Sequence, residues 1–233
     1  VDYYGFFGVV KNANISNLTF DNAYVAVTEP YSSSEFVETY VGVLAGAVVG
    51  SSVQNVTVKN SQVLGNYVGG LVGLADQGSQ ISRFVGEGIR ISNDKDNSST
   101  RDYVYLGGVV GKLREESSVS LSSLNLLNIT SNAYGRQGFM GGIAGFVDGT
   151  YCEGEPVYYN YVMGTFFENN SNRNNVGYAI GRVKYNNIGR LMHSVYYVIK
   201  SGTSSIPSDA FDPSVIGSFG YGSTSLSPSV LEK

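Results

Sequence analysis

The chain of 233 residues has one cysteine, Cys152, and one histidine, His193, and a pair of this kind can perform nucleophilic catalysis. Such a pair also needs an acidic group to orient the imidazole, and no acidic residue lies near His193 in the sequence. We therefore predict no catalytic site and no enzymatic activity. Cys152 lies in the polar segment TYCEGEP, where an unpaired cysteine can form a disulfide between two chains.

Two segments are rich in acidic residues, residues 148–155 and residues 94–102. In the second segment, oxygen-bearing side chains alternate as calcium ligands do: Asp94, Asp96, Ser98, Thr100 and Asp102. However, Ser99 stands where a calcium loop has glycine, and Tyr105 stands where it has a bidentate glutamate. We interpret both segments as solvated turns and predict no metal and no cofactor. A calcium loop at Asp94, Asp96 and Asp102 is the alternative.

Asn-x-Ser/Thr sequons supply candidate modification sites. Three of them, NLT, NVT and NIT, are expected to lie in equivalent turns of a repeated sequence. In a secreted eukaryotic protein these asparagines are glycan acceptors, whereas stacking of asparagines in successive turns is the purely structural explanation. The candidate acceptors are Asn14, Asn17, Asn55, Asn97, Asn128 and Asn169.

Charge and hydropathy exclude two classes of partner. The net charge is −4, the isoelectric point is near 5.0 and no stripe of lysine or arginine occurs, so we predict no binding to nucleic acid. The apolar run from Tyr40 to Gly50 spans 11 residues, and a spanning helix needs about 20. We therefore predict no membrane span.

A glycine-containing motif recurs along the chain, at intervals of 27 to 38 residues between its closing glycines. The copies read YYGFFG, YVGVLAG, YVGGLVG, YLGGVVG, FMGGIAG and NVGYAIG, and they end at Gly8, Gly46, Gly73, Gly111, Gly145 and Gly181. A phosphate-binding loop is used once and precedes a helix, but here no helical pattern follows any copy. The repetition therefore indicates an array of similar structural units.

Seven or eight residues after most closing glycines comes a second apolar segment, for example ISNLTF from Ile15 and VQNVTV from Val53. Short runs of β-branched and aromatic residues, separated by Gly, Asn and Ser, are typical of strands and turns. We predict an all-β fold, a parallel β-solenoid (β-helix) of about six irregular rungs in residues 1–203. Residues 204–233, rich in Ser, Gly and Pro, are expected to form a C-terminal tail or cap.

In a solenoid, equivalent positions stack on one another. The aromatic residues that open the motif, Tyr40, Tyr67, Tyr105 and Phe139, are expected to stack as a ladder. The glycines at both ends of this strand are expected to allow sharp corners and positive φ angles.

The GGLVG-like strand, the polar turn and the following IxN segment resemble the GLUG repeat of secreted bacterial surface proteins and adhesin-like proteins. The resemblance covers roughly Tyr3 to Ser201, and the closing run from HSVYYVIKSG onward is similar to the end of such arrays. The chain departs from the family in having no tryptophan, in Ser194 where cysteine is common, and in its uneven spacers. The resemblance implies display at a cell surface and no fixed chemistry.

We therefore expect a secreted or cell-surface protein with a non-enzymatic structural role, in adhesion or in a fibre. The alternative is a β-helix that binds or processes polysaccharide, with Tyr158, Tyr159 and Tyr161 as its platform. A host-surface or carbohydrate ligand and head-to-tail self-assembly are the expected partners. The tail from Ser204 to Lys233 either covers its own last rung or completes the first rung of another copy.

Overall fold

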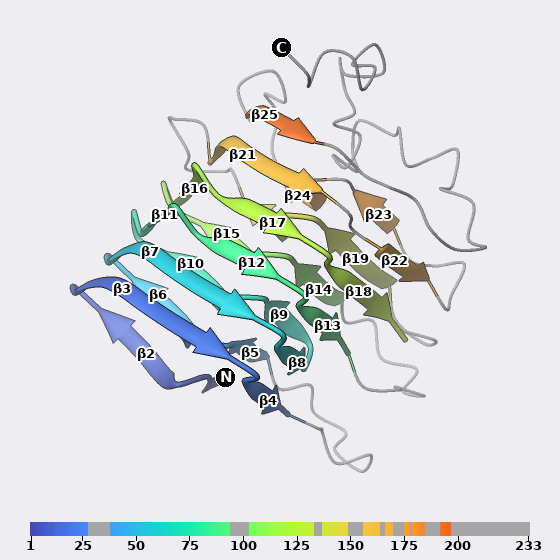
Figure 1. Cartoon of the computed structure of the whole chain (residues 1–233), viewed down its shortest axis with the longest axis horizontal. Helices are drawn as coiled ribbons and strands as arrows, with labels where there is room; N and C mark the ends of the chain where they lie inside the picture. The colour runs from blue at the N-terminus through green and yellow to red at the C-terminus, as the bar shows by residue number, and fades with distance from the viewer. Residues whose placement is uncertain are drawn as a thin grey trace.

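The computed structural model describes residues 1–27, 38–93, 103–132, 137–148, 156–163, 166–169, 175–177, 179–184 and 192–196. All elements formed by these residues are β-strands, and the strands pair in parallel with their equivalents in neighbouring turns. The chain is thus a parallel β-solenoid, which confirms the predicted fold class (Figure 1). None of the described residues forms a helix long and apolar enough to cross a membrane.

Each turn passes in chain order through four stacks of strands, here called sheets A, B, C and D. We number the turns by their strand in sheet A. The strands of sheet A are β1 (Asp2–Tyr4), β5 (Thr39–Gly42), β9 (Tyr67–Gly69), β14 (Tyr103–Gly107), β19 (Gln137–Gly141) and β23 (Asn175–Gly177). Those of sheet B are β2 (Phe7–Lys11), β6 (Ala45–Val49), β10 (Val72–Asp76), β15 (Val110–Arg114), β20 (Ala144–Asp148) and β24 (Ile180–Lys184).

Sheet C lies in front in Figure 1 and has the longest strands. Its members are β3 (Asn14–Asp21), β7 (Ser52–Lys59), β11 (Gln80–Ser82), β12 (Val85–Glu87), β16 (Ser118–Ser120), β17 (Ser123–Asn125), β21 (Val157–Met163) and β25 (Met192–Tyr196). In turns 3 and 4 the strand is interrupted, so that β11 with β12, and β16 with β17, replace one long strand. Sheet D contains β4 (Tyr24–Ala26), β8 (Gln62–Leu64), β13 (Arg90–Ser92), β18 (Asn128–Ser131) and β22 (Phe166–Asn169).

Inward-facing aliphatic side chains fill the coil in vertical rows. One such row consists of Val53, Ile81, Val119 and Val157, which are in register and at most 1% exposed. Burying a valine or isoleucine of this kind contributes roughly 1.5–3 kcal/mol. Because each row continues from turn to turn, every turn supplies the apolar cover that its neighbours need.

The closing glycines of the repeat lie where the backbones of sheets A and B meet. A Cβ atom on Gly46, Gly73, Gly111, Gly145 or Gly181 would lie closer than 3.0 Å to backbone atoms of the sheet A strand of the preceding turn. Gly111, for example, packs against the backbone of Tyr67 and Val68. The expectation that the repeat glycines provide positive φ angles is therefore wrong, because only Gly50, Gly78 and Gly88 among the described glycines have them. The repeat requires glycine for close approach.

We predict that Gly111→Ala is strongly destabilising, whereas Gly8→Ala is tolerated. The two glycines share one register position, since Gly8 aligns with Gly46 and Gly46 with the later copies, but Gly8 has only Tyr3 O within 4 Å of its Cβ position, at 3.6 Å. Forcing a methyl group between two backbones costs about 1–3 kcal/mol or more. Urea unfolding monitored by circular dichroism measures both variants. Equal losses of stability would show that the contact between sheets A and B is not tight.

The corners of the coil are formed by residues in the left-handed conformation, which costs a non-glycine residue about 1–2 kcal/mol and which asparagine tolerates best. This explains why asparagine recurs in the turns. The left-handed residues are Asn12, Gly50, Gln77, Gly78, Glu115 and Glu116 between sheets B and C; Asn17, Asn55, Arg83 and Leu121 within sheet C; and Asn22, Asn60, Gly88 and Leu126 between sheets C and D.

Serine hydroxyls complete the hydrogen bonding at the corner between sheets B and C. The backbone N–H of Ala13 donates to Ser51 Oγ at 3.2 Å, that of Ser51 to Ser79 Oγ at 3.2 Å, and that of Ser79 to Ser117 Oγ at 3.1 Å. Each serine thus accepts from the turn before it, and Ser79 Oγ also donates to the carbonyl of Asp76 at 2.7 Å. The same bond recurs at other bends, from Ala23 N to Ser61 Oγ and from Phe84 N to Ser122 Oγ.

We predict that Ser79→Ala lowers the free energy of unfolding by about 1–3 kcal/mol, because it leaves the buried N–H of Ser51 without its acceptor. Ser16→Ala is the control, since Ser16 is exposed and its hydroxyl accepts only a long, exposed bond from Asn17 at 3.4 Å. Thermal and urea unfolding of both variants provide the measurement. A loss no larger than that of the control would contradict the role given to the serine row.

Candidate functional site

The predicted aromatic ladder runs along sheet A and begins one turn earlier than expected. Tyr3, Tyr40, Tyr67, Tyr105 and Phe139 are in register, and successive ring centroids are 5.0–5.6 Å apart. The last four rings are only 2–5% exposed. These rings are therefore closed to a ligand, and their contacts bind one turn to the next.

Sheet B supplies the side chains that cover the ladder. In successive turns the facing position holds Ala47, Leu74, Lys112, Phe146 and Arg182. The rings and their apolar cover form a second buried cluster, separate from the main core. Two members of this row are cations, and they give the cluster the only unusual electrostatics found in the described residues.

Lys112 extends along the faces of three rings. Its Nζ atom lies 5.9, 5.5 and 5.9 Å from the ring centroids of Tyr40, Tyr67 and Phe146, donates to Tyr40 Oη at 3.3 Å, and is 3.9 Å from a carboxylate oxygen of Glu38. Burial lowers the pKa of the Lys112 amine, and the Glu38 carboxylate partly opposes this change. The rings and the carboxylate together compensate for the amine's lost hydration.

The Tyr40 hydroxyl links the lysine to the same carboxylate, because it donates to Glu38 Oε2 at 2.8 Å while it accepts from Lys112. Burial, together with this bond to Glu38, raises the pKa of Tyr40. The phenol therefore stays protonated and holds Glu38 and Lys112 in fixed positions.

Arg182 repeats the arrangement two turns later. Its guanidinium lies 4.4 Å from the ring centroid of Tyr103 and 4.9 Å from that of Phe139, and it donates to Tyr105 Oη at 3.3 Å. Burial raises the pKa of Tyr105 to about 12, even though Arg182 acts in the opposite direction. Both cations are thus fully engaged with rings and oxygens of the chain itself, so the cluster serves cohesion between turns.

The raised pKa of Tyr105 predicts a loss of stability in alkaline solution. The folded state holds the phenol proton more tightly than the unfolded state does. The contribution of this group to the free energy of unfolding is therefore complete below pH 10 and is lost as the pH rises to about 12. Tyr105→Phe removes the titrating group, and we expect its free energy of unfolding to fall less steeply than that of the wild type, by about 1.4 kcal/mol per pH unit. Urea titrations across this range test it, with Tyr161→Phe as an exposed control. Identical slopes for the wild type and Tyr105→Phe would refute the assignment.

Three sequon asparagines lie on the outer face of sheet C. Asn14, Asn17 and Asn55 are exposed, and Asn17 and Asn55 are equivalent positions at which Asn55 Nδ2 donates to Asn17 Oδ1 at 3.3 Å. The expected equivalence of the third sequon, NIT, is wrong. Asn128 lies in β18 of sheet D, half-buried, and its Oδ1 accepts from Thr130 Oγ1 at 3.0 Å.

Other candidates from the sequence fall partly or wholly outside the described residues. Asp94, Asp96, Asp102, Asn97 and Cys152 lie outside them, as does the tail from residue 204. The backbones of His193 in β25 and Asn169 in β22 are described, but their side chains are not.

The tyrosines proposed as a sugar platform lie in β21 of sheet C. Tyr161 is exposed and Tyr158 is half-buried, whereas the side chain of Tyr159 is not described. Of these tyrosines, Tyr161 therefore presents an exposed ring on this face and Tyr158 a half-buried one.

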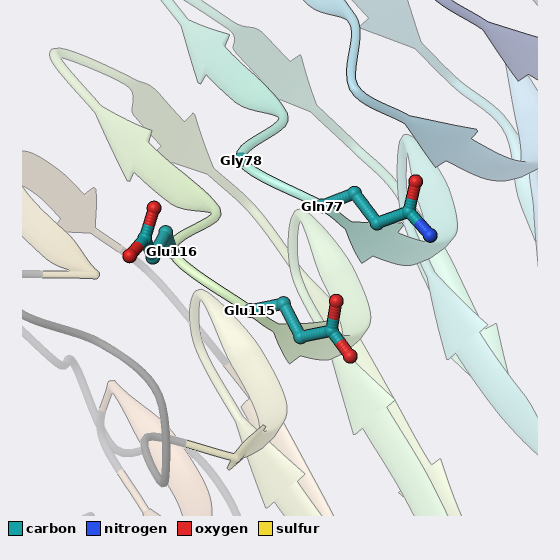
Figure 2. A pocket seen from close by; sticks show the side chains of 4 residues that line it. All are labelled: Gln77, Gly78, Glu115 and Glu116. Atoms are coloured by element: carbon teal, nitrogen blue, oxygen red, sulfur yellow. The ribbon is translucent and has the colours of Figure 1, made fainter.

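The described surface has a shallow hollow at the corner between sheets B and C in turns 3 and 4. It is lined by Gln77, Gly78, Glu115 and Glu116, and Figure 2 shows Gln77 and Glu115 extending to one side while Glu116 points to the other. Arg114 lies 3.5 Å from Asp76 and 3.4 Å from Glu115. No group of three or more potential metal ligands occurs among the residues that the structure describes.

Comparisons of the chain with family models, with curated proteins and with solved structures find no match.

Proposed function

We propose that the chain is a non-enzymatic structural module, a rigid β-solenoid displayed outside the cell that acts in adhesion or assembly. The observation that carries this proposal is that the repeated residues act between turns. The closing glycines pack sheet B on sheet A, the corner serines cap the preceding turn, and the aromatic residues stack as a buried ladder. Recurring residues that all act in stacking support a continuous rod as the role of the repeat.

The extracellular location is supported by sequence features. The repeat resembles the GLUG repeat of surface proteins, and three sequons lie exposed on sheet C. An antibody against the purified chain should label intact source cells without permeabilisation. Labelling that appears only after permeabilisation would contradict display at the surface. End-to-end assembly of the module stays a prediction, which electron microscopy of the purified protein tests.

We predict that the module tolerates the removal of one complete turn. Deleting residues 73–110 joins Val72 to Gly111, and register is kept because Val72 and Val110 are equivalent. The shortened chain should unfold cooperatively and still label at the cell surface, since a structural rod needs no particular turn. Deleting residues 73–111 is the matched control. It slips the register by one residue, turns every following side chain to the wrong face, and should abolish folding.

A processing enzyme and a sugar-binding module would behave differently from a structural rod. Incubation with a panel of neutral and acidic polysaccharides should release no oligosaccharide, and a glycan array should give no saturable signal. Catalytic release that disappears in the 73–110 deletion would overturn the structural proposal in favour of an enzyme. Saturable binding that Tyr161→Ala abolishes would favour the carbohydrate-binding alternative.

A further inference from the structure

Four large apolar side chains are exposed on the outer side of sheet C in turns 3 to 5. Val85 is 41%, Leu121 52%, Leu126 60% and Tyr161 39% exposed, with Leu126 at the corner toward sheet D. Around them lie short polar side chains, such as Ser82, Ser118, Ser123 and Asn125, and two exposed charged residues of turn 3, Arg83 and Glu87, of which Glu87 pairs with Lys59. An apolar centre with a polar rim is the composition of a protein interface.

The two leucines are also in unfavourable conformations. Leu121 has φ 52° and Leu126 has φ 55°. At the position of Leu121 the three preceding turns have Asn17, Asn55 and Arg83, and at the position of Leu126 they have Asn22, Asn60 and Gly88. A leucine that is both exposed and left-handed contributes little to the fold of its own chain. Such a departure from the local rules is typical of a site that serves binding.

The register gives the four side chains a symmetric arrangement. Val85, Ser123 and Tyr161 share one position in turns 3, 4 and 5, so Val85 and Tyr161 lie on opposite sides of turn 4. Leu121 and Leu126 both belong to turn 4 itself. Consider a two-fold axis that lies in the outer face and runs along β16 and β17. It places turn 4 of a second copy against turn 4 of the first, and turn 5 of the second copy against turn 3 of the first.

We propose that this face binds a second copy of the chain about that axis. Leu121 and Leu126 each meet their own equivalents, and Val85 meets Tyr161 of the second copy. An isologous contact of this kind is self-complementary and closes as a dimer. It is independent of the proposed function, since it concerns lateral pairing of two solenoids and requires neither surface display nor end-to-end assembly.

The dimensions of the face indicate a weak, concentration-dependent dimer. The five strand levels from β7 to β25, each about 4.8 Å wide, cover about 24 Å across turns, and an eight-residue strand is about 26 Å long, which gives a footprint of roughly 600 Å² per copy. A total of about 1,200 Å² is at the lower end of specific interfaces. Of the candidate glycan acceptors, Asn14 and Asn17 lie in β3, outside this face, and Asn55 lies in β7, at its edge.

The first test introduces the asparagine that turns 1 and 2 have at both leucine positions. Leu121→Asn combined with Leu126→Asn should weaken dimerisation at least about tenfold in sedimentation equilibrium, without lowering the melting temperature of the monomer. Tyr24→Asn is the control, because Tyr24 is 68% exposed in sheet D of turn 1, away from the face. A wild-type chain that stays monomeric at all concentrations, or a dimer that survives the double substitution, would overturn the proposal.

The second test examines whether Val85 of one copy contacts Tyr161 of the other. Val85→Lys alone and Tyr161→Glu alone should each weaken the dimer at least about tenfold, and the chain with both substitutions should regain it through two Lys–Glu contacts across the axis. The chain with Val85→Lys and Tyr161→Lys is the matched control and should remain monomeric. Failure of the oppositely charged pair to regain the dimer would show that the axis is placed wrongly.

Discussion

The contact between the backbones of sheets A and B determines the rest of the turn. It requires a residue without a side chain once per turn in sheet B, and the closing glycines meet that requirement. The residues that follow the glycine in sheet B divide between two clusters: Ala47 and Phe146 belong to the cluster of the aromatic ladder, where Lys112 and Arg182 also lie, whereas Val48 and Val147 belong to the main core.

The solenoid and its ladder could be predicted from the sequence because both depend on residue types that recur. A glycine motif at a long period has few physical explanations, and Tyr40, Tyr67 and Tyr105 keep the same place in it. The role of the glycines was not predictable in the same way. Both close approach and positive φ favour glycine, and only the structure shows that residues other than glycine, asparagine more often than any other type, take most of the left-handed positions.

The contacts of Lys112 and Arg182 with the ladder, and the exposed face around Leu121 and Leu126, could not be predicted because no sequence pattern marks them. The position that faces the ladder holds Ala47, Leu74, Lys112, Phe146 and Arg182, which share neither size nor charge. For the sequons, a similar sequence pattern does not mean an equivalent position, since NVT at Asn55 and NIT at Asn128 look alike but belong to different sheets. Unequal spacers between the motifs hide which strand a short segment joins. Leu121 resembles a core residue in sequence, and its exposure follows only from its left-handed backbone.

The row of corner serines gives the solenoid a polarity. Every hydroxyl in the row accepts an N–H from the turn before it, so each turn relies on its successor and never on its predecessor for this bond. When a turn loses its successor, a buried backbone N–H is left without an acceptor. When it loses its predecessor, only a serine hydroxyl is freed, and water can bond to it. Fraying therefore costs different amounts at the two ends of any stretch of turns. A rod built this way unfolds more readily from its N-terminal end than from its C-terminal end. Its resistance to unfolding under force therefore depends on the end from which turns are pulled away.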